Sequence, residues 1–188
     1  MNSNFTLENI THKQLLQALF RSQLLFFILA LSLSLFLFEH FSDWITLFSF
    51  NIKEIMIYGV IPGFIIILFN LFMKYLIPKK HLDDGGINEK LFKNSSVWEI
   101  FQIAFVVAIC EEILFRGLLQ TSFGLIFAST IFALVHFRYL KKPILLISIV
   151  IISFYLGFLY EITGNLLITI IVHFIVDFVL GLIIRFEK

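Results

Sequence analysis

Ionisable side chains interrupt several of the most apolar stretches of this 188-residue chain. They are Glu111, Glu112, Arg116, His136, His173 and Asp177. At the centre of a membrane helix a carboxylate or a guanidinium costs roughly 2.5–3.5 kcal/mol, so such residues face the interior of a bundle, pair with one another and usually mark function. Their presence in so small a chain predicts a polar site inside an apolar bundle.

The adjacent acids Glu111 and Glu112 are expected to have different roles. Glu112 and Arg116 are four residues apart, the spacing at which a carboxylate and a guanidinium pair on one helix face. Glu111 lies about 100° further round the helix, outside that pair. We expect Glu112 to be a structural acid and Glu111 to be a general base in a polar cavity. The alternative is a plain salt bridge between Glu112 and Arg116, with Glu111 reaching the membrane interface.

Two histidines extend this set. His136 follows Phe132 by four residues near the end of an apolar segment, a pattern that alone is more typical of a hydrogen-bonded helix end. His173 and Asp177 have the same spacing within an apolar helix, so the carboxylate can orient the imidazole or share a metal or a water with it. The alternative for this second pair is a hydrogen bond that only staples the helix.

These residues support two hydrolytic chemistries. In one, His136, His173 and Asp177 bind a divalent metal such as zinc, and Glu111 deprotonates the water on it. In the other there is no metal, Glu111 alone activates the water, and His173 or His136 stabilises the oxyanion. The residue types leave both open.

Serine and cysteine nucleophiles are poorly supported. Ser129, Ser148 and Ser153 lack a Gly-x-Ser-x-Gly context, and each can bond the preceding turn of its own helix. Cys110 precedes Glu111, but consecutive helix residues point about 100° apart. As the one cysteine of the chain, Cys110 also excludes an intramolecular disulfide and a cysteine-cluster metal site.

The composition requires a membrane around the site. Apolar residues make up 60% of the chain and charged residues 14%, and the apolar residues form blocks near the roughly 20 residues that span a bilayer. A net charge of +1 gives no reason to expect a nucleic-acid partner. The sequence therefore predicts an all-α, polytopic transmembrane bundle.

Six spans are predicted, and a loop divides them into two groups. The spans are Leu24–Phe38, Ile55–Ile77, Val97–Leu119, Ser122–His136, Ile144–Tyr160 and Leu166–Ile184. Helical spacing continues before Leu24, so the first helix is expected to begin near Thr11 and to remain as an anchor. Ser96 and Glu99 form a capping-box pattern for the third span. The polar loop 78–95 separates an N-terminal part, residues 1–94 with two spans, from a four-helix core, residues 95–188.

Basic residues set the orientation. With the N-terminus inside, nearly all of them fall on the cytoplasmic side, as the positive-inside rule requires. They are Lys13, Arg21, Lys74, Lys79, Lys80, Lys90, Lys93, Arg138, Lys141, Lys142, Arg185 and Lys188, with Lys53 and Arg116 as the exceptions. Both termini are thus expected in the cytoplasm. At about 1.5 Å per residue, Glu111 then lies nearer the outer face and His136 nearer the inner, unless the spans tilt or a turn over 117–124 lies within the membrane.

In this order, the motifs Glu111-Glu112-x-x-x-Arg116, Phe132-x-x-x-His136 and His173-x-x-x-Asp177 resemble those of the CPBP family of intramembrane proteases. That family includes the type II CAAX prenyl proteases and Abi-like bacteriocin-processing and immunity proteins. The resemblance covers about residues 95–185 and includes Gly164-Asn165-Leu166, whereas the first two spans carry no motif. Many members have Asn where this chain has Asp177.

The resemblance implies an intramembrane endopeptidase that cuts a membrane-associated peptide or protein, in a multi-pass protein of the bacterial plasma membrane. Glu111 would activate the water with Glu112 and Arg116 in support. His136, His173 and Asp177 would bind the metal, the water or the oxyanion. The alternatives are a non-catalytic scaffold or bacteriocin self-immunity protein, and a small proton- or cation-coupled transporter.

Overall fold

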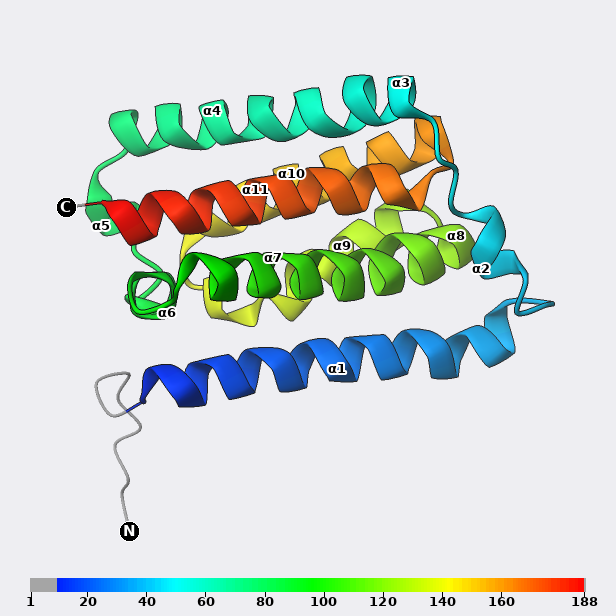
Figure 1. The fold of residues 1–188 in the computed structure, drawn as a ribbon, viewed down its shortest axis with the longest axis horizontal. Coiled ribbons are helices and arrows are strands. Elements are labelled where there is room, and N and C mark those ends of the chain that lie inside the picture. Colours follow the sequence, from blue (N-terminus) through cyan, green and yellow to red (C-terminus); the bar gives the residue numbers. More distant parts are fainter. Residues whose placement is uncertain (1–9, 188) are drawn as a thin grey trace, which may run out of the picture.

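A computed structural model describes residues 10–187 as a bundle of helices, and no strand occurs in that part of the chain. The long helices run side by side, with α11 in the middle of the bundle and α1 and α4 on opposite outer sides (Figure 1). The predicted all-α class is confirmed.

Six helical segments correspond to the six predicted spans. They are α1 (His12–Leu37); α3 (Ile52–Glu54), η2 (Ile55–Val60) and α4 (Ile61–Leu76); α7 (Val97–Glu112), η3 (Ile113–Gln120) and α8 (Thr121–Phe123); α9 (Leu125–Val135); α10 (Pro143–Thr163); and α11 (Leu166–Phe186). The segments η2 and η3 are π-helical. Thr11 caps α1 and Ser96 caps α7, each in a capping box, so both predicted starts are confirmed.

Within residues 10–187, four helices are long and apolar enough to cross a membrane: His12–Leu37, Ile52–Leu76, Pro143–Thr163 and Leu166–Phe186. The α7–α8 segment is also long, but it carries the charged motif. The outer surface displays large apolar side chains on these helices, including Leu24, Leu25, Ile65, Leu68 and Ile151. Hydrocarbon is the medium in which such a surface is stable, so the chain is a multi-pass membrane protein.

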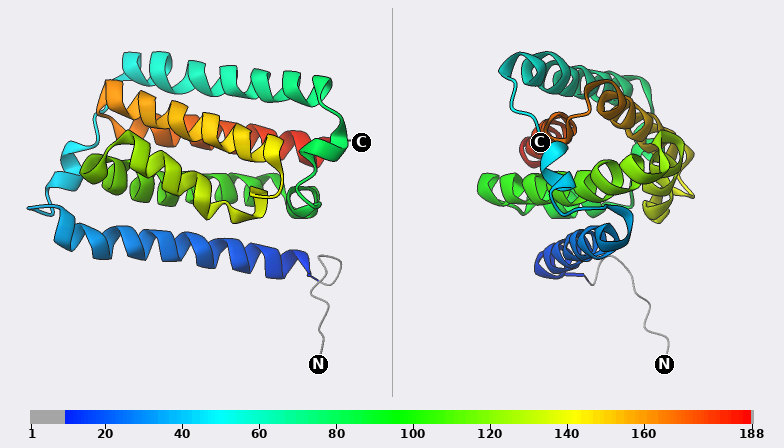
Figure 2. Two further views of the ribbon diagram at one scale, coloured as in Figure 1. Left: turned by 180° about the vertical axis from the view of Figure 1, so that it is seen from behind. Right: turned by 90° about the vertical axis from the view of Figure 1, so that its right-hand side faces the viewer.

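The polar connections gather at one end of the bundle. The start of α1, the short helices α5 (Lys79–Leu82) and α6 (Ile87–Lys93), and the end of α11 lie at the same end, opposite α2 (Asp43–Thr46), α3 and α8 (Figures 1 and 2). Lys74 pairs with Glu187 there, with 2.5 Å between Nζ and Oε2. Most of the basic residues assigned to the cytoplasm thus share one end. This arrangement supports the predicted orientation of the chain.

The third and fourth spans meet at one residue, Gly124. The expected turn over 117–124 is wrong in extent, because the chain stays helical through Phe123 and reverses at Gly124. Gly124 has φ +85°, a conformation that a side chain would strain. The third span therefore ends four residues later than its predicted end at Leu119, while α9 is short.

Candidate active site

The two adjacent acids lie where the third span changes its helical form. Glu111 and Glu112 are the last residues of α7, and the π-helical segment η3 begins at the next residue. π-Helical turns inside α-helices often occur at functional sites, since they shift side chains relative to the regular helical register. Only 5% of Glu111 and none of Glu112 is exposed, so both carboxylates depend on protein partners.

Glu112 has the partners expected of a structural acid. Arg116 Nη1 donates to Glu112 Oε1 over 2.9 Å, which confirms the predicted pair. The same oxygen lies 2.8 Å from Nδ1 of His173 on α11. On the other side of that ring, Nε2 lies 3.5 Å from Asp177 Oδ2, which confirms that His173 and Asp177 share one space. A continuous chain of charges therefore links η3 to α11.

Arg116 is also fixed from the far side. Its Nη2 donates to the carbonyl oxygen of Ser153 over 2.9 Å and to the hydroxyl oxygen of Ser153 over 3.2 Å. The guanidinium carbon lies 4.6 Å from the centre of the Phe132 ring, a cation–π arrangement. The buried guanidinium is thus bound on three sides and has little freedom to act elsewhere.

The serines only partly follow their predicted behaviour. Ser148 bonds the carbonyl of Ile144 in its own preceding turn, as expected. For Ser129 and Ser153 that expectation is wrong, because each hydroxyl lies 3.3 Å from the other residue's carbonyl oxygen, across the α9–α10 interface. Both hydroxyls are engaged in holding helices together.

Glu111 has a different partner, which the sequence did not indicate. Gln23 Nε2 donates to Glu111 Oε1 over 3.0 Å, and Gln23 is 4% exposed on α1. The first span carries no motif, yet it supplies this contact to Glu111. The sequence feature that could have indicated this contact is weak: Gln23 is a single amide side chain immediately before the apolar run that starts at Leu24.

His136 ends α9 and is oriented by its own helix. Its Nδ1 lies 2.7 Å from the carbonyl oxygen of Phe132. Because a carbonyl oxygen can only accept, Nδ1 carries a proton, and Nε2 is the nitrogen left for other partners. The Phe132 ring centre lies 4.7 Å from the His136 ring and 6.4 Å from the His173 ring. All three motifs thus meet around Phe132.

The expected difference in depth between Glu111 and His136 is wrong for a geometric reason. At about 1.5 Å per residue, Glu111 lies about 21 Å from the start of α7, and Phe123 lies about 39 Å from it. Helix α9 runs back from Gly124, which returns His136 to about 22 Å. The longer third span and the short fourth one bring the two residues level without a turn at Gly117.

A metal site is not assembled by these residues as they lie. Among the residues that the structure describes, no group of three or more His, Cys, Asp and Glu side chains is placed to hold a metal ion. His136 presents a nitrogen in the manner of a metal ligand, but His173 faces carboxylates from both ring nitrogens. The zinc site of His136, His173 and Asp177 therefore stays a prediction.

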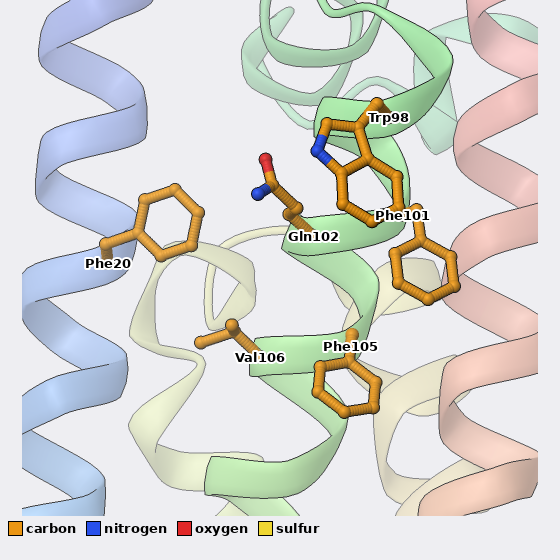
Figure 3. A pocket seen from close by; sticks show the side chains of 6 residues that line it. All are labelled: Phe20, Trp98, Phe101, Gln102, Phe105 and Val106. Atoms are coloured by element: carbon orange, nitrogen blue, oxygen red, sulfur yellow. The ribbon is translucent and has the colours of Figure 1, made fainter.

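An apolar groove of about 490 Å³ lies between α1 and α7. Phe20 projects from α1 toward α7, and Gln102 and Val106 project from α7 toward α1 (Figure 3). Phe20 is three residues before Gln23, so the two are neighbours on α1. The groove thus ends about one helical turn from the contact between Gln23 and Glu111.

Comparison with known proteins agrees with this geometry. Residues 93–179 match the model of a family described as type II CAAX prenyl endopeptidase Rce1-like. The match contains all three motifs. The chain is also 44% identical over 166 residues to the uncharacterized protein YpbD of Bacillus subtilis (strain 168), covering 88% of each chain. No solved structure matches the chain.

Proposed function

The chain belongs to the Rce1-like, type II CAAX prenyl endopeptidase branch of the CPBP family, and on that premise we propose that it is an intramembrane endopeptidase. Its substrate is a peptide or protein associated with the membrane, processed in the CAAX or the bacteriocin manner. Water is the nucleophile, and Glu111 activates it. Glu112, Arg116, His136, His173 and Asp177 form the rest of the site.

This proposal rests on the different hydrogen-bond partners of the two adjacent acids. Glu112 is bound by Arg116 and His173 through one oxygen, which keeps it ionised and immobile. Glu111 is equally removed from solvent, yet its hydrogen bond comes from the neutral amide of Gln23. Among the described residues Glu111 makes no ion pair, so its carboxylate is not locked as that of Glu112 is and can act as the general base. Two neighbouring acids in different surroundings thus divide structural and chemical roles.

The reaction follows from these positions. Glu111 takes a proton from the water as its oxygen bonds to the carbonyl carbon of the scissile peptide bond. The negative charge that develops on the carbonyl oxygen accepts a hydrogen bond from a histidine. When the intermediate collapses, the carbon–nitrogen bond breaks and Glu111 returns its proton to the leaving amine. The products are a carboxylic acid, which releases the second proton of the water on ionising, and an amine, and Glu111 is regenerated.

His173 is the better placed oxyanion donor. Glu112 holds its Nδ1, which fixes the orientation of the ring. Its Nε2 lies 3.5 Å from Asp177 Oδ2, longer than a normal N–H···O hydrogen bond, so an N–H at this position has no short acceptor among the described residues and can donate to a substrate oxygen in the ring plane. Glu112 and Asp177 flank the ring and balance the charge of an imidazolium. His136 can donate from Nε2 only when both of its ring nitrogens carry a proton, because the Nδ1 proton is already given to the carbonyl of Phe132.

The groove between α1 and α7 is the proposed path for the substrate chain. It is lined mainly by Phe20, Trp98, Phe101 and Phe105 and opens toward the outer surface of the bundle. An apolar peptide segment in the bilayer would reach Glu111 through it without crossing water.

Cleavage of a membrane-peptide library by the purified protein in lipid vesicles tests the proposal. New termini identified by mass spectrometry are expected with the wild type and are expected to disappear with Glu111→Gln. Glu39→Gln is the matched control, because Glu39 is exposed at the far end of α1. If Glu111→Gln still processes a native substrate, the proposed hydrolase function is wrong, and the alternative of a scaffold or immunity protein is favoured.

A further inference from the structure

Gln23 lies on α1 and therefore outside the residues 93–179 that match the family. It is among the few buried polar residues of α1, together with Ser34. Burying an amide in an apolar surrounding is unfavourable unless both of its ends find partners. The hydroxyl of Ser34 satisfies itself on the carbonyl of Leu31 in its own helix, whereas Gln23 reaches across to α7.

The Gln23 amide turns its donor end to Glu111. Its Nε2 faces the Glu111 carboxylate at 3.0 Å. Because Nε2 is the donor end of the amide, the carbonyl oxygen of Gln23 points away from this contact. Glu111 Oε1 is thus held by Gln23, and its other oxygen makes no hydrogen bond to any residue that the structure describes.

The other end of the amide is unsatisfied. Gln23 Oε1 is buried and has no hydrogen-bond partner among the described residues. A buried acceptor without a donor costs about 1–3 kcal/mol, so such groups usually have a reason. A water beside Glu111 would supply the missing O–H and would then be held between the Gln23 carbonyl and the Glu111 carboxylate.

We propose that Gln23 is the positioning residue of the general base: its N–H holds the Glu111 carboxylate, and its carbonyl oxygen orients the water that Glu111 deprotonates. This rests on the proposed function and deepens it. It also gives α1 a task beyond anchoring, because the first span supplies the partner of the acid on the third. The family motifs alone therefore do not make a complete site.

The test uses Gln23→Met in the full chain, in lipid vesicles. Methionine has nearly the shape of glutamine and suits an apolar surrounding, but it has neither the donor nor the acceptor. Gln17→Met is the matched control, since Gln17 is exposed on the same helix. We expect Gln23→Met to fold as stably as the wild type and to lose about 100-fold in kcat/KM, the cost of a misplaced catalytic group.

Two further readouts separate positioning from packing. The acid limb of the kcat/KM profile should move to higher pH by about one unit in Gln23→Met, because an ionised carboxylate has lost a charge-assisted hydrogen bond. Labelling of Glu111 by dicyclohexylcarbodiimide, which attacks protonated carboxyl groups in membranes, should persist to correspondingly higher pH. Peptide mapping locates the label without any need for activity.

The outcomes distinguish the two proposals. A wild type that cleaves, with Gln23→Met matching it in kcat/KM and in both pH profiles, overturns the role of Gln23 alone. A wild type that cleaves nothing overturns the proposed function, while the labelling experiment still decides whether Gln23 controls the proton on Glu111. Equal loss in Gln23→Met and Gln17→Met would make the effect one of α1 packing and would also overturn the inference.

Discussion

Arg116 and His173 meet on the same oxygen of Glu112, at 2.9 and 2.8 Å, although they come from different helices. Glu112 thereby links η3 to α11 in the interior of the bundle, where none of the carboxylate is exposed. The other oxygen, Glu112 Oε2, has no hydrogen-bond partner among the residues described. The structure therefore predicts that this contact contributes substantially to the free energy of unfolding.

Breaking the contact should be costly on either side. Glu112→Met leaves the guanidinium of Arg116 buried without its anion, for which we expect a loss of about 3–5 kcal/mol in unfolding free energy, and Arg116→Met should cost somewhat less because Glu112 keeps His173. The double variant should lose clearly less than the sum, because neither charge remains. Thermal or denaturant unfolding in detergent micelles measures this. The exposed pair of Lys74 and Glu187 is the reference and should contribute below about 1 kcal/mol. Additive losses at Glu112 and Arg116 would show that they do not interact.

The orientation in the membrane can be measured with single cysteines. In a Cys110→Ser background, Asn94→Cys should react with a membrane-impermeant maleimide only from the cytoplasmic side. Ser42→Cys, at the opposite end of the bundle, should react only from outside. The reason is that the basic connections share the end that carries residue 94. The reverse labelling pattern in sealed cells and inverted vesicles would contradict an inward-facing N-terminus.

Metal removal separates the two chemistries that the sequence left open. Because Nδ1 of His173 is bound to Glu112 and its Nε2 faces Asp177 at 3.5 Å, we expect cleavage to persist after chelation. The metal content of the purified wild type and of the His173→Ala variant shows whether the site holds a metal, and this measurement does not depend on cleavage. Stoichiometric metal in the wild type, lost in His173→Ala and accompanied by chelator-sensitive cleavage, would instead establish a metal-bound hydroxide held by His136, His173 and Asp177.

Local spacing predicted the parts of the site that lie within one helix. The pairs Glu112–Arg116 and His173–Asp177 follow from four-residue separations on a helix, which brings side chains together whatever the surrounding fold. The capping boxes at Thr11 and Ser96 were readable for the same reason. Apolar periodicity likewise located the six spanning segments, with errors at their ends, but it missed the short helices α2, α5 and α6, the last two of which lie in the predicted loop 78–95.

Contacts between helices were not readable in this way. Gln23 and Glu111 are 88 residues apart, and Arg116 and Ser153 are 37 residues apart. Their meeting depends on how α1 and α10 pack against α7 and η3, which no local pattern specifies. The single-residue reversal at Gly124 was missed for a related reason: two glycines, Gly117 and Gly124, suggested a longer turn, and only the packed structure shows which one has a positive φ.

Glu111 and Glu112 are adjacent but differ in role, and a comparison of Glu111→Gln with Glu112→Gln measures that difference. For each purified variant in lipid vesicles, kcat/KM and the unfolding temperature are measured together. Glu111→Gln should keep the unfolding temperature of the wild type and lose about 10²–10⁴-fold in kcat/KM. Glu112→Gln should instead have a clearly lower unfolding temperature than the wild type. Wild-type cleavage by a folded Glu111→Gln variant would contradict the division of roles.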